Sequence, residues 1–106
     1  MANYPYRGAV AGTATLVKTG YTQVFWMHVS NRDASERWLQ MFDAKAAGEV
    51  SLGTTVPTHS IPIAASGTLP LEVRSDWQKG LVIAVTTTET GSTGASTAAV
   101  INARVG

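Results

Sequence analysis

Apolar and polar residues alternate along much of the chain, in short segments that turn residues separate. The cleanest alternation lies in residues 69–74, where Leu69, Leu71 and Val73 are interleaved with a proline and two charged residues. Successive side chains of a β-strand point to opposite faces, so this period predicts half-buried strands. Such segments recur about every ten residues without helical stretches between them, which predicts an all-β sandwich or jelly-roll-like barrel of about seven or eight antiparallel strands.

One segment departs from this alternation because it is apolar on both sides. Strict alternation over residues 21–29 puts two apolar sets on opposite faces, namely Phe25, Met27 and Val29 on one and Val24 and Trp26 on the other. A strand of this kind is central in its sheet or covered by a neighbouring subunit. The segment therefore predicts either a central strand or a subunit contact.

Proline and short polar stretches mark the boundaries of the expected strands. Pro62 interrupts the strand-like run from Ile61 to Ile63. Because proline has no N–H to donate to a β-ladder, this strand is expected at a sheet edge or with a bulge. Residues 44–49 are too few for an independent helix, and we expect a loop there.

The 106 residues fit one domain without an internal repeat or a linker. We expect an N-terminal arm over residues 1–11 and a single β domain over residues 12–106. The arm combines Tyr4, Tyr6 and Arg7 with a proline, and aromatic rings on a polar segment suit docking on a neighbouring surface. A disordered leader is the alternative.

Composition narrows the possible partners. The chain has 8 basic and 7 acidic residues, a net charge of +1, and no basic cluster, so we expect no nucleic-acid partner. It has no apolar run near the roughly 20 residues of a membrane span, and its first residues do not resemble a signal peptide. We therefore expect no membrane partner. The absence of cysteine excludes disulfides and thiolate chemistry.

The sequence contains no constellation that predicts catalysis, a metal or a cofactor. Residues 12–19 resemble a phosphate-binding glycine loop until Val17, which replaces the glycine that such a loop needs. His28 and His59 are far apart and predict no metal site. We expect no enzyme; the least favoured alternative is a pair of surface carboxylates acting as acid and base, drawn from Glu36, Asp43, Glu72 and Asp76.

Aromatic residues are the better candidates for a binding surface, because a flat ring covers a large area at small entropic cost. The core is the simpler interpretation for Trp26 and Trp38, which lie in expected strands, whereas Trp77 lies between loop-like residues and suits an interface or a cap. The interface candidates are Tyr4, Tyr6, Arg7, Tyr21, Trp26 and Trp77.

Several short motifs from residue 39 onward form a recognisable series. Residues 39–44 precede a loop with the pattern Gly-Thr-x-x-Pro at 53–57, then Ile-Pro-Ile at 61–63, and then a glycine-led strand at 80–88 that ends in a run of threonines. Gly-Ser-Thr at 91–93 and Val-Ile-Asn at 100–102 follow. This series resembles the small all-β structural proteins of tailed bacteriophages and prophages, the capsid decoration or cement proteins.

The resemblance implies a virion protein without catalytic residues. Such a protein is made in the host cytoplasm and stabilises the capsid by binding the outer head surface between capsomers. Its expected partners are the major capsid protein and copies of itself, typically as a homotrimer. The alternative is a carbohydrate- or receptor-binding β module of a phage tail or head fibre, which would use Trp77 and the neighbouring loops.

Overall fold

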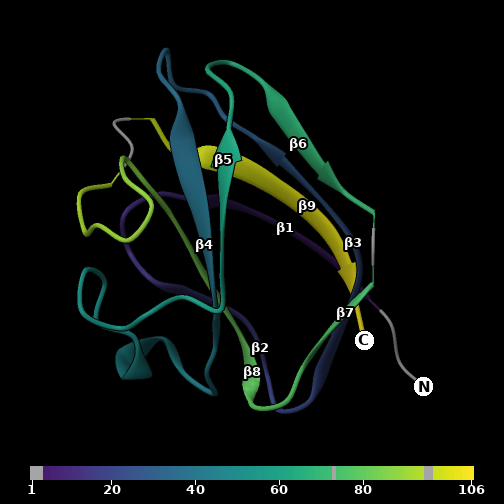
Figure 1. The fold of residues 1–106 in the computed structure, drawn as a ribbon. Helices are drawn as coiled ribbons and strands as arrows, with labels where there is room; N and C mark the ends of the chain where they lie inside the picture. The colour runs from purple at the N-terminus through teal and green to yellow at the C-terminus, as the bar shows by residue number, and fades with distance from the viewer. Residues whose placement is uncertain (1–3, 73, 95–96) are drawn as a thin grey trace.

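The computed structural model describes residues 4–72, 74–94 and 97–106, which form two antiparallel sheets packed face to face (Figure 1). Sheet A has the order β1 (Tyr4–Val10), β9 (Ala99–Val105), β3 (Thr22–Ser30) and β6 (Thr68–Leu71), and β7 (Ser75–Trp77) also pairs with β3. Sheet B has the order β2 (Thr15–Thr19), β8 (Gly80–Thr86), β4 (Arg37–Asp43) and β5 (His59–Ile63). The predicted all-β sandwich is confirmed, with nine strands in the described residues rather than seven or eight.

The core lies between the sheets and follows the two-residue period of the strands. In β9, Ile101 and Ala103 are buried, whereas Asn102 between them is half-buried and Arg104 is exposed. Residues opposite each other on neighbouring strands share a face, so Met27 opposite Ala103 and Val29 opposite Ile101 extend the same core. The alternation predicted for residues 69–74 holds for Leu69 and Leu71, which pack against the core from β6. Val73 lies outside the described residues.

A bulge in β3 overturns the predicted division of its two faces. The pairing of β3 with β9 shifts register between Val24 and Trp26. The extra residue lets Val24, Met27 and Val29 all point into the core, although strict alternation separates Val24 from the other two. Phe25, expected beside Met27, is only half-buried. The position of β3 inside sheet A agrees with the central strand that its apolar character predicted.

The edge strands of both sheets carry features that hinder the addition of another strand. Pro5 lies in β1, Pro62 in β5 and Pro70 in β6, and each removes an N–H from an edge. Edge strand β2 has an irregular register between Leu16 and Lys18. The edge position predicted for Pro62 is therefore correct. Association through strand pairing is disfavoured at β1, β2, β5 and β6, whereas β7, on the same edge of sheet A as β6, contains no proline.

The N-terminal segment is part of the sandwich, which corrects the arm expected over residues 1–11. Residues from Tyr4 to Val10 pair with β9 along their whole length. The chain then crosses to sheet B, where Val85 N donates to Ala11 O at 3.0 Å. At this crossing the backbones of Gly12 and Gly94 touch so closely that a Cβ on either glycine would overlap the other. Residues 1–3 lie outside the described residues.

The loop expected over residues 44–49 contains one 3-10 turn, η1 (Ala47–Glu49). This short turn ends where Val50 N donates to Ala47 O at 3.1 Å. No helix that could span a membrane occurs in the described part of the chain.

Candidate binding face

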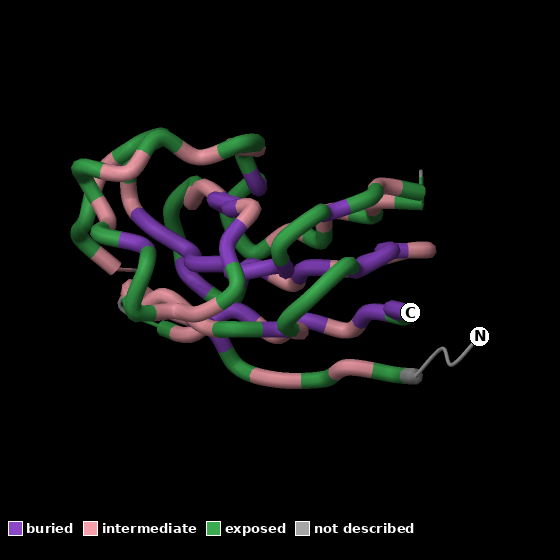
Figure 2. Tube along the Cα trace, turned by 90° about the horizontal axis from the view of Figure 1, so that it is seen from below, coloured by how far each residue is buried: buried purple, intermediate pink, exposed green. Residues whose placement is uncertain are grey.

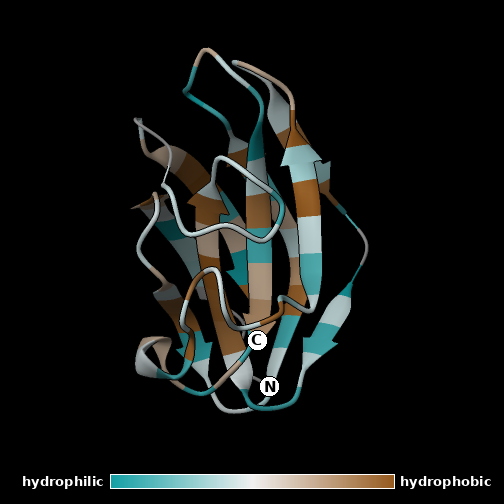
Figure 3. Cartoon of the chain, turned by 60° about the vertical axis from the view of Figure 1, so that its left-hand side comes forward, coloured by the Kyte–Doolittle hydropathy of each residue, from teal (hydrophilic) through white to brown (hydrophobic). Residues whose placement is uncertain are grey.

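Two loops of the chain itself cover the outer face of sheet B. Residues 44–58 pack over Phe42 and Val82, which form a second buried cluster with Ala44 and Val50. Residues 87–94 lie over Gln40, whose Nε2 donates to Thr86 Oγ1 at 2.7 Å and to Gly91 O at 3.0 Å. Figure 3 shows loops crossing in front of this sheet. All seven residues of β8 are therefore buried. Figure 2 shows buried segments, in purple, in the middle of the molecule with exposed segments, in green, around them.

The outer face of sheet A carries a different set of side chains, and we call it the open face. Each outward residue on β3 has a partner on β9, and the next edge strand, β1, continues the rows. Trp26 lies opposite Arg104 in one row, and His28 lies opposite Asn102 in the next. The open face consists of Arg7, Trp26, His28, Val100, Asn102 and Arg104.

The side chains of the open face are accessible to different degrees. Arg7 and Arg104 are exposed, whereas Trp26, His28 and Asn102 are half-buried. The rings of Trp26 and His28 lie 5.1 Å apart between centroids, with an angle of 50° between their planes. At the β6 side of this face, His28 Nε2 lies 3.3 Å from Glu72 Oε2. The arrangement presents a flat aromatic and polar surface that a second macromolecule can cover.

Trp77, predicted as an interface residue, belongs to the core. Its side chain is 2% exposed, because Trp77 pairs with Thr22 on β3 and points between the sheets. The indole Nε1 donates to Ser75 Oγ at 3.0 Å, and the ring meets His59 edge-on with centroids 5.6 Å apart. Residues flanking Trp77 have the small and polar character of a loop, but Ser75–Trp77 forms a short strand. The predicted stacking platform at Trp77 is therefore wrong.

Tyr6 and Tyr21, two of the tyrosines predicted as interface residues, do not lie on the open face. Tyr6 lies on the inner side of β1, packs against the core over Gly8, and has a pKa raised above its ordinary value by burial. Tyr21 is 47% exposed at the turn between β2 and β3, where its hydroxyl accepts a hydrogen bond from Gln23 Nε2 at 3.4 Å. Tyr4 begins β1 opposite Val105.

Of the six predicted interface residues, the open face brings together Arg7 and Trp26. His28, Asn102 and Arg104 belong to the same surface and were not predicted as site residues. For Asn102 and Arg104, the signal in the sequence is the alternation of residues 99–105, in which every second residue is apolar and small or branched. The alternation indicates an outward side for Asn102 and Arg104, but the strand order β1-β9-β3 is needed to unite that side with Trp26.

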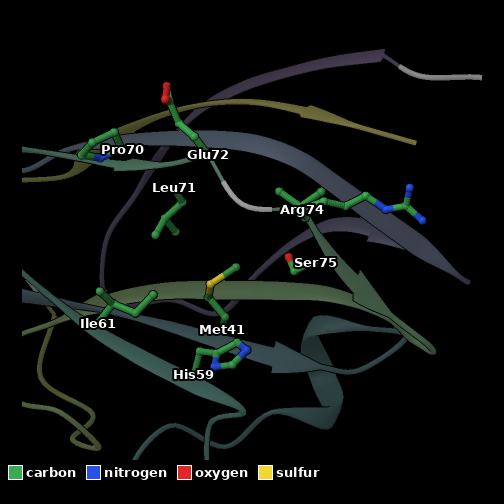
Figure 4. Close-up of a pocket in the computed structure, with 9 residues that line it drawn as sticks. Met41, His59, Ile61, Pro70, Leu71, Glu72, Arg74 and Ser75 are labelled. Carbon is green, nitrogen blue, oxygen red and sulfur yellow. The ribbon is translucent and has the colours of Figure 1, made fainter.

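A groove opens between edge strand β5 and strands β6 and β7, where the two sheets do not close on each other. Its volume is about 350 Å³. Met41, Ile61 and Leu71 extend into this space, whereas the charged ends of Glu72 and Arg74 point away from it (Figure 4). The groove can hold an apolar group but presents no acid and base directed at one point.

The described residues contain no cluster of three or more His, Asp or Glu side chains that could hold a metal ion. The carboxylates considered as an acid–base pair are spread over the fold. Asp43 Oδ1 accepts a hydrogen bond from Lys79 N at 2.8 Å, Asp76 pairs with Arg74 at 3.3 Å, and Glu72 meets His28. Each of these three carboxylates therefore contacts a different partner, and none of these contacts joins two of them.

The fold and the open face define a small two-sheet β-sandwich with one covered and one uncovered outer face. No family model, curated protein or solved structure matches the chain.

Proposed function

We propose that this chain is a structural virion protein that decorates a tailed-phage capsid, with the open face lying on the head surface between capsomers. The observation that carries the proposal is the asymmetry of the sandwich, whose sheet A exposes Trp26 among polar groups while the chain itself covers sheet B. The major capsid protein is the partner, and copies of the chain associate as a homo-oligomer, a trimer by the resemblance.

The design of the edges supports docking through a face. Prolines in β1, β5 and β6 hinder the addition of a partner strand to these strands, the irregular register of β2 hinders it there, and β7 is only three residues long. With the inner faces packed together and the outer face of sheet B covered, the open face is the extended flat surface left for a partner.

The size of the open face supports binding to a repeating partner. Its residues lie on β1, β9 and β3. Three strands about 4.8 Å apart and about 25 Å long span roughly 360 Å², which is below the roughly 800 Å² that each partner of a standard interface buries. A single contact of this size is weak. Many copies on a lattice, or several linked in one oligomer, sum such contacts into stable decoration.

Binding to isolated heads tests the proposal. Purified protein is mixed with expanded, undecorated heads of the phage that encodes it, and co-sedimentation is measured. We expect binding at micromolar concentration, and at least a tenfold loss of affinity for Trp26→Ala, because a buried interface tryptophan commonly dominates binding.

Trp38→Ala is the matched control, because Trp38 is also half-buried but lies on β4 of sheet B. It should bind like the unaltered protein. Absence of co-sedimentation for the unaltered protein, or equal losses for the two tryptophan variants, contradicts the proposal.

A carbohydrate-binding module is the second candidate function. Its aromatic platform would be Trp26 in place of Trp77, on which the sequence-based alternative relied. The half-exposed Trp26, beside His28 and Asn102, offers an aromatic platform with hydrogen-bonding neighbours, which the buried Trp77 does not. A glycan array, followed by tryptophan fluorescence with any sugar that binds, tests it. Binding that Trp26→Ala abolishes would favour this candidate.

A further inference from the structure

One apolar side chain projects from the first of the two loops that cover sheet B. Val56 is 83% exposed, more than any other large hydrophobic residue in the described part of the chain. Hydrogen bonds hold the loop on both sides of it. Thr55 N donates to Ser51 O at 2.8 Å, and Thr58 N donates to Met41 O at 2.9 Å. The fold therefore presents Val56 in a fixed position, and a group that is already ordered loses less entropy on binding.

The groove between β5 and strands β6 and β7 matches such a side chain in size and character. Its volume is about 350 Å³, and Met41, Ile61 and Leu71 extend into it (Figure 4). Pockets of this size hold small apolar groups. An apolar side chain that leaves water for this groove gains contact with three others, which is favourable.

Charged side chains beside the two surfaces are complementary. Lys79 lines the same hollow as Val56, and its ammonium group has no partner among the described residues. Glu72 lines the groove, and its side chain is 70% exposed although Oε2 lies 3.3 Å from His28. A cation therefore stands beside the projecting valine, and an accessible carboxylate stands beside the groove.

We infer that a second copy of the chain occupies the groove, with the Val56 of one copy seated in the groove of the next and its Lys79 beside Glu72. This inference rests on the proposed function, in which copies associate, and it names the surfaces that they use. Because the two surfaces differ, the contact is heterologous, and every groove is filled when the copies close into a ring. None of the six open-face residues lines the groove or the Val56 hollow in the described chain, so this contact does not use the open face.

A small apolar ligand accounts for fewer of these observations. It would fill the groove, but it would leave Val56 in water and give no role to the loop that holds it. A single exposed valine is ordinary on a protein surface. Here it is combined with an ordered loop, an apolar groove and a matching pair of charges.

Sedimentation velocity of the full chain tests this inference without phage heads. We expect an assembly of two or more copies that dissociates on dilution, within the range from about 1 mM to about 1 µM that weak contacts cover. Val56→Asp should weaken association at least about tenfold, because a carboxylate would enter an apolar groove without a partner. Leu16→Asp, the matched change at an exposed apolar residue on β2, should leave association unchanged.

A mixture of two variants tests whether Val56 and the groove meet between copies. Ile61→Glu alters the groove and keeps Val56, whereas Val56→Asp alters the loop and keeps the groove. Each variant alone should be monomeric, and the equimolar mixture should form a dimer through the one intact contact. NMR spectra of the free variants establish that each has the native fold. His59→Glu, at an exposed lining residue, takes the place of Ile61→Glu if that variant does not fold.

A charge exchange tests the pairing of Lys79 with Glu72. Lys79→Glu should weaken association about twofold to threefold, because exposed ion pairs contribute little. Adding Glu72→Lys to the same chain should restore it. Absence of restoration would overturn this pairing.

The seating of Val56 in the groove is overturned by a monomeric unaltered protein, which would leave the groove to a small ligand. It is also overturned by equal effects of Val56→Asp and Leu16→Asp, or by a mixture that stays monomeric. Failure of undecorated heads to bind the protein would overturn the proposed capsid docking alone, because the sedimentation experiment does not use heads.

Discussion

The outer faces of the two sheets follow the same strand geometry and reach opposite outcomes. On sheet B, the outward positions include Phe42 and Val82, and two loops bury them. On sheet A, the corresponding outward positions include His28, Asn102 and Arg104, which pack no second cluster. Burying an uncharged apolar side chain is favourable, whereas burying a charge without a partner is costly, so the residue types decide which face the chain covers.

The two loops that cover sheet B also contact each other. A Cβ added to Gly53 would meet Ser92 Cβ at 3.3 Å, so the loop of residues 44–58 touches the loop of residues 87–94. Gly94 in turn touches Gly12, where the chain crosses between the sheets. The two loops therefore belong to the folded unit, and the open face is the outer sheet face that they leave uncovered.

The largest effect on stability is expected from a substitution at Phe42, on the covered face of sheet B. Phe42→Ala removes a ring that is 2% exposed beneath the covering loop, and such truncations destabilise proteins by about 3–5 kcal/mol. Urea unfolding followed by tryptophan fluorescence measures the loss. A loss below about 1 kcal/mol would mean that the loop is a loose appendage and that sheet B also has an available outer face.

Two valines allow the same substitution to be compared on the outer faces of the two sheets. Val82 on β8 is fully buried under the loops, whereas Val100 on β9 lies half-buried on the open face. We expect Val82→Ala to lower the unfolding free energy by about 2 kcal/mol and Val100→Ala by less than about 1 kcal/mol, because burial differs. Equal losses in chemical denaturation would indicate that both outer faces are covered.

The smallest expected effect separates the inner from the outer side of β1. Burial raises the pKa of Tyr6, so the folded chain holds this proton more tightly than the unfolded chain. The stability that Tyr6 contributes is then complete below about pH 10 and is lost as the pH rises through the raised pKa. Urea midpoints at pH 8 and pH 11 should differ less for Tyr6→Phe than for the unaltered protein. Identical differences would place Tyr6 outside the core.

The sequence predicts the architecture well, because the alternation of apolar and polar residues and the positions of the turns determine where the strands lie. Leu69 and Leu71 point inward as their period requires, and Pro62 marks an edge. The composition of a strand also indicates its environment, as the apolar character of residues 21–29 does for the central strand β3.

The predictions that were wrong concern residues whose orientation depends on the strand they pair with more than on the composition of their own segment. The bulge at Phe25 depends on the register with β9, and the inward side of Trp77 depends on its pairing with β3. Residues near the N-terminus resemble an arm because Pro5 is rigid and Arg7 is charged. In the structure both residues occupy outward positions of the edge strand β1. The open face was missed for the same reason, since Arg7, Trp26 and Arg104 meet only through the order of the strands.

Electron cryo-microscopy of heads decorated with the purified protein tests the proposed orientation, because it determines which surface of the sandwich meets the shell. We expect sheet A to lie against the capsomers, with Trp26, Arg7 and Arg104 at the contact and the loops of residues 44–58 and 87–94 turned toward solvent. Density that places those loops on the shell and leaves sheet A uncovered would contradict it.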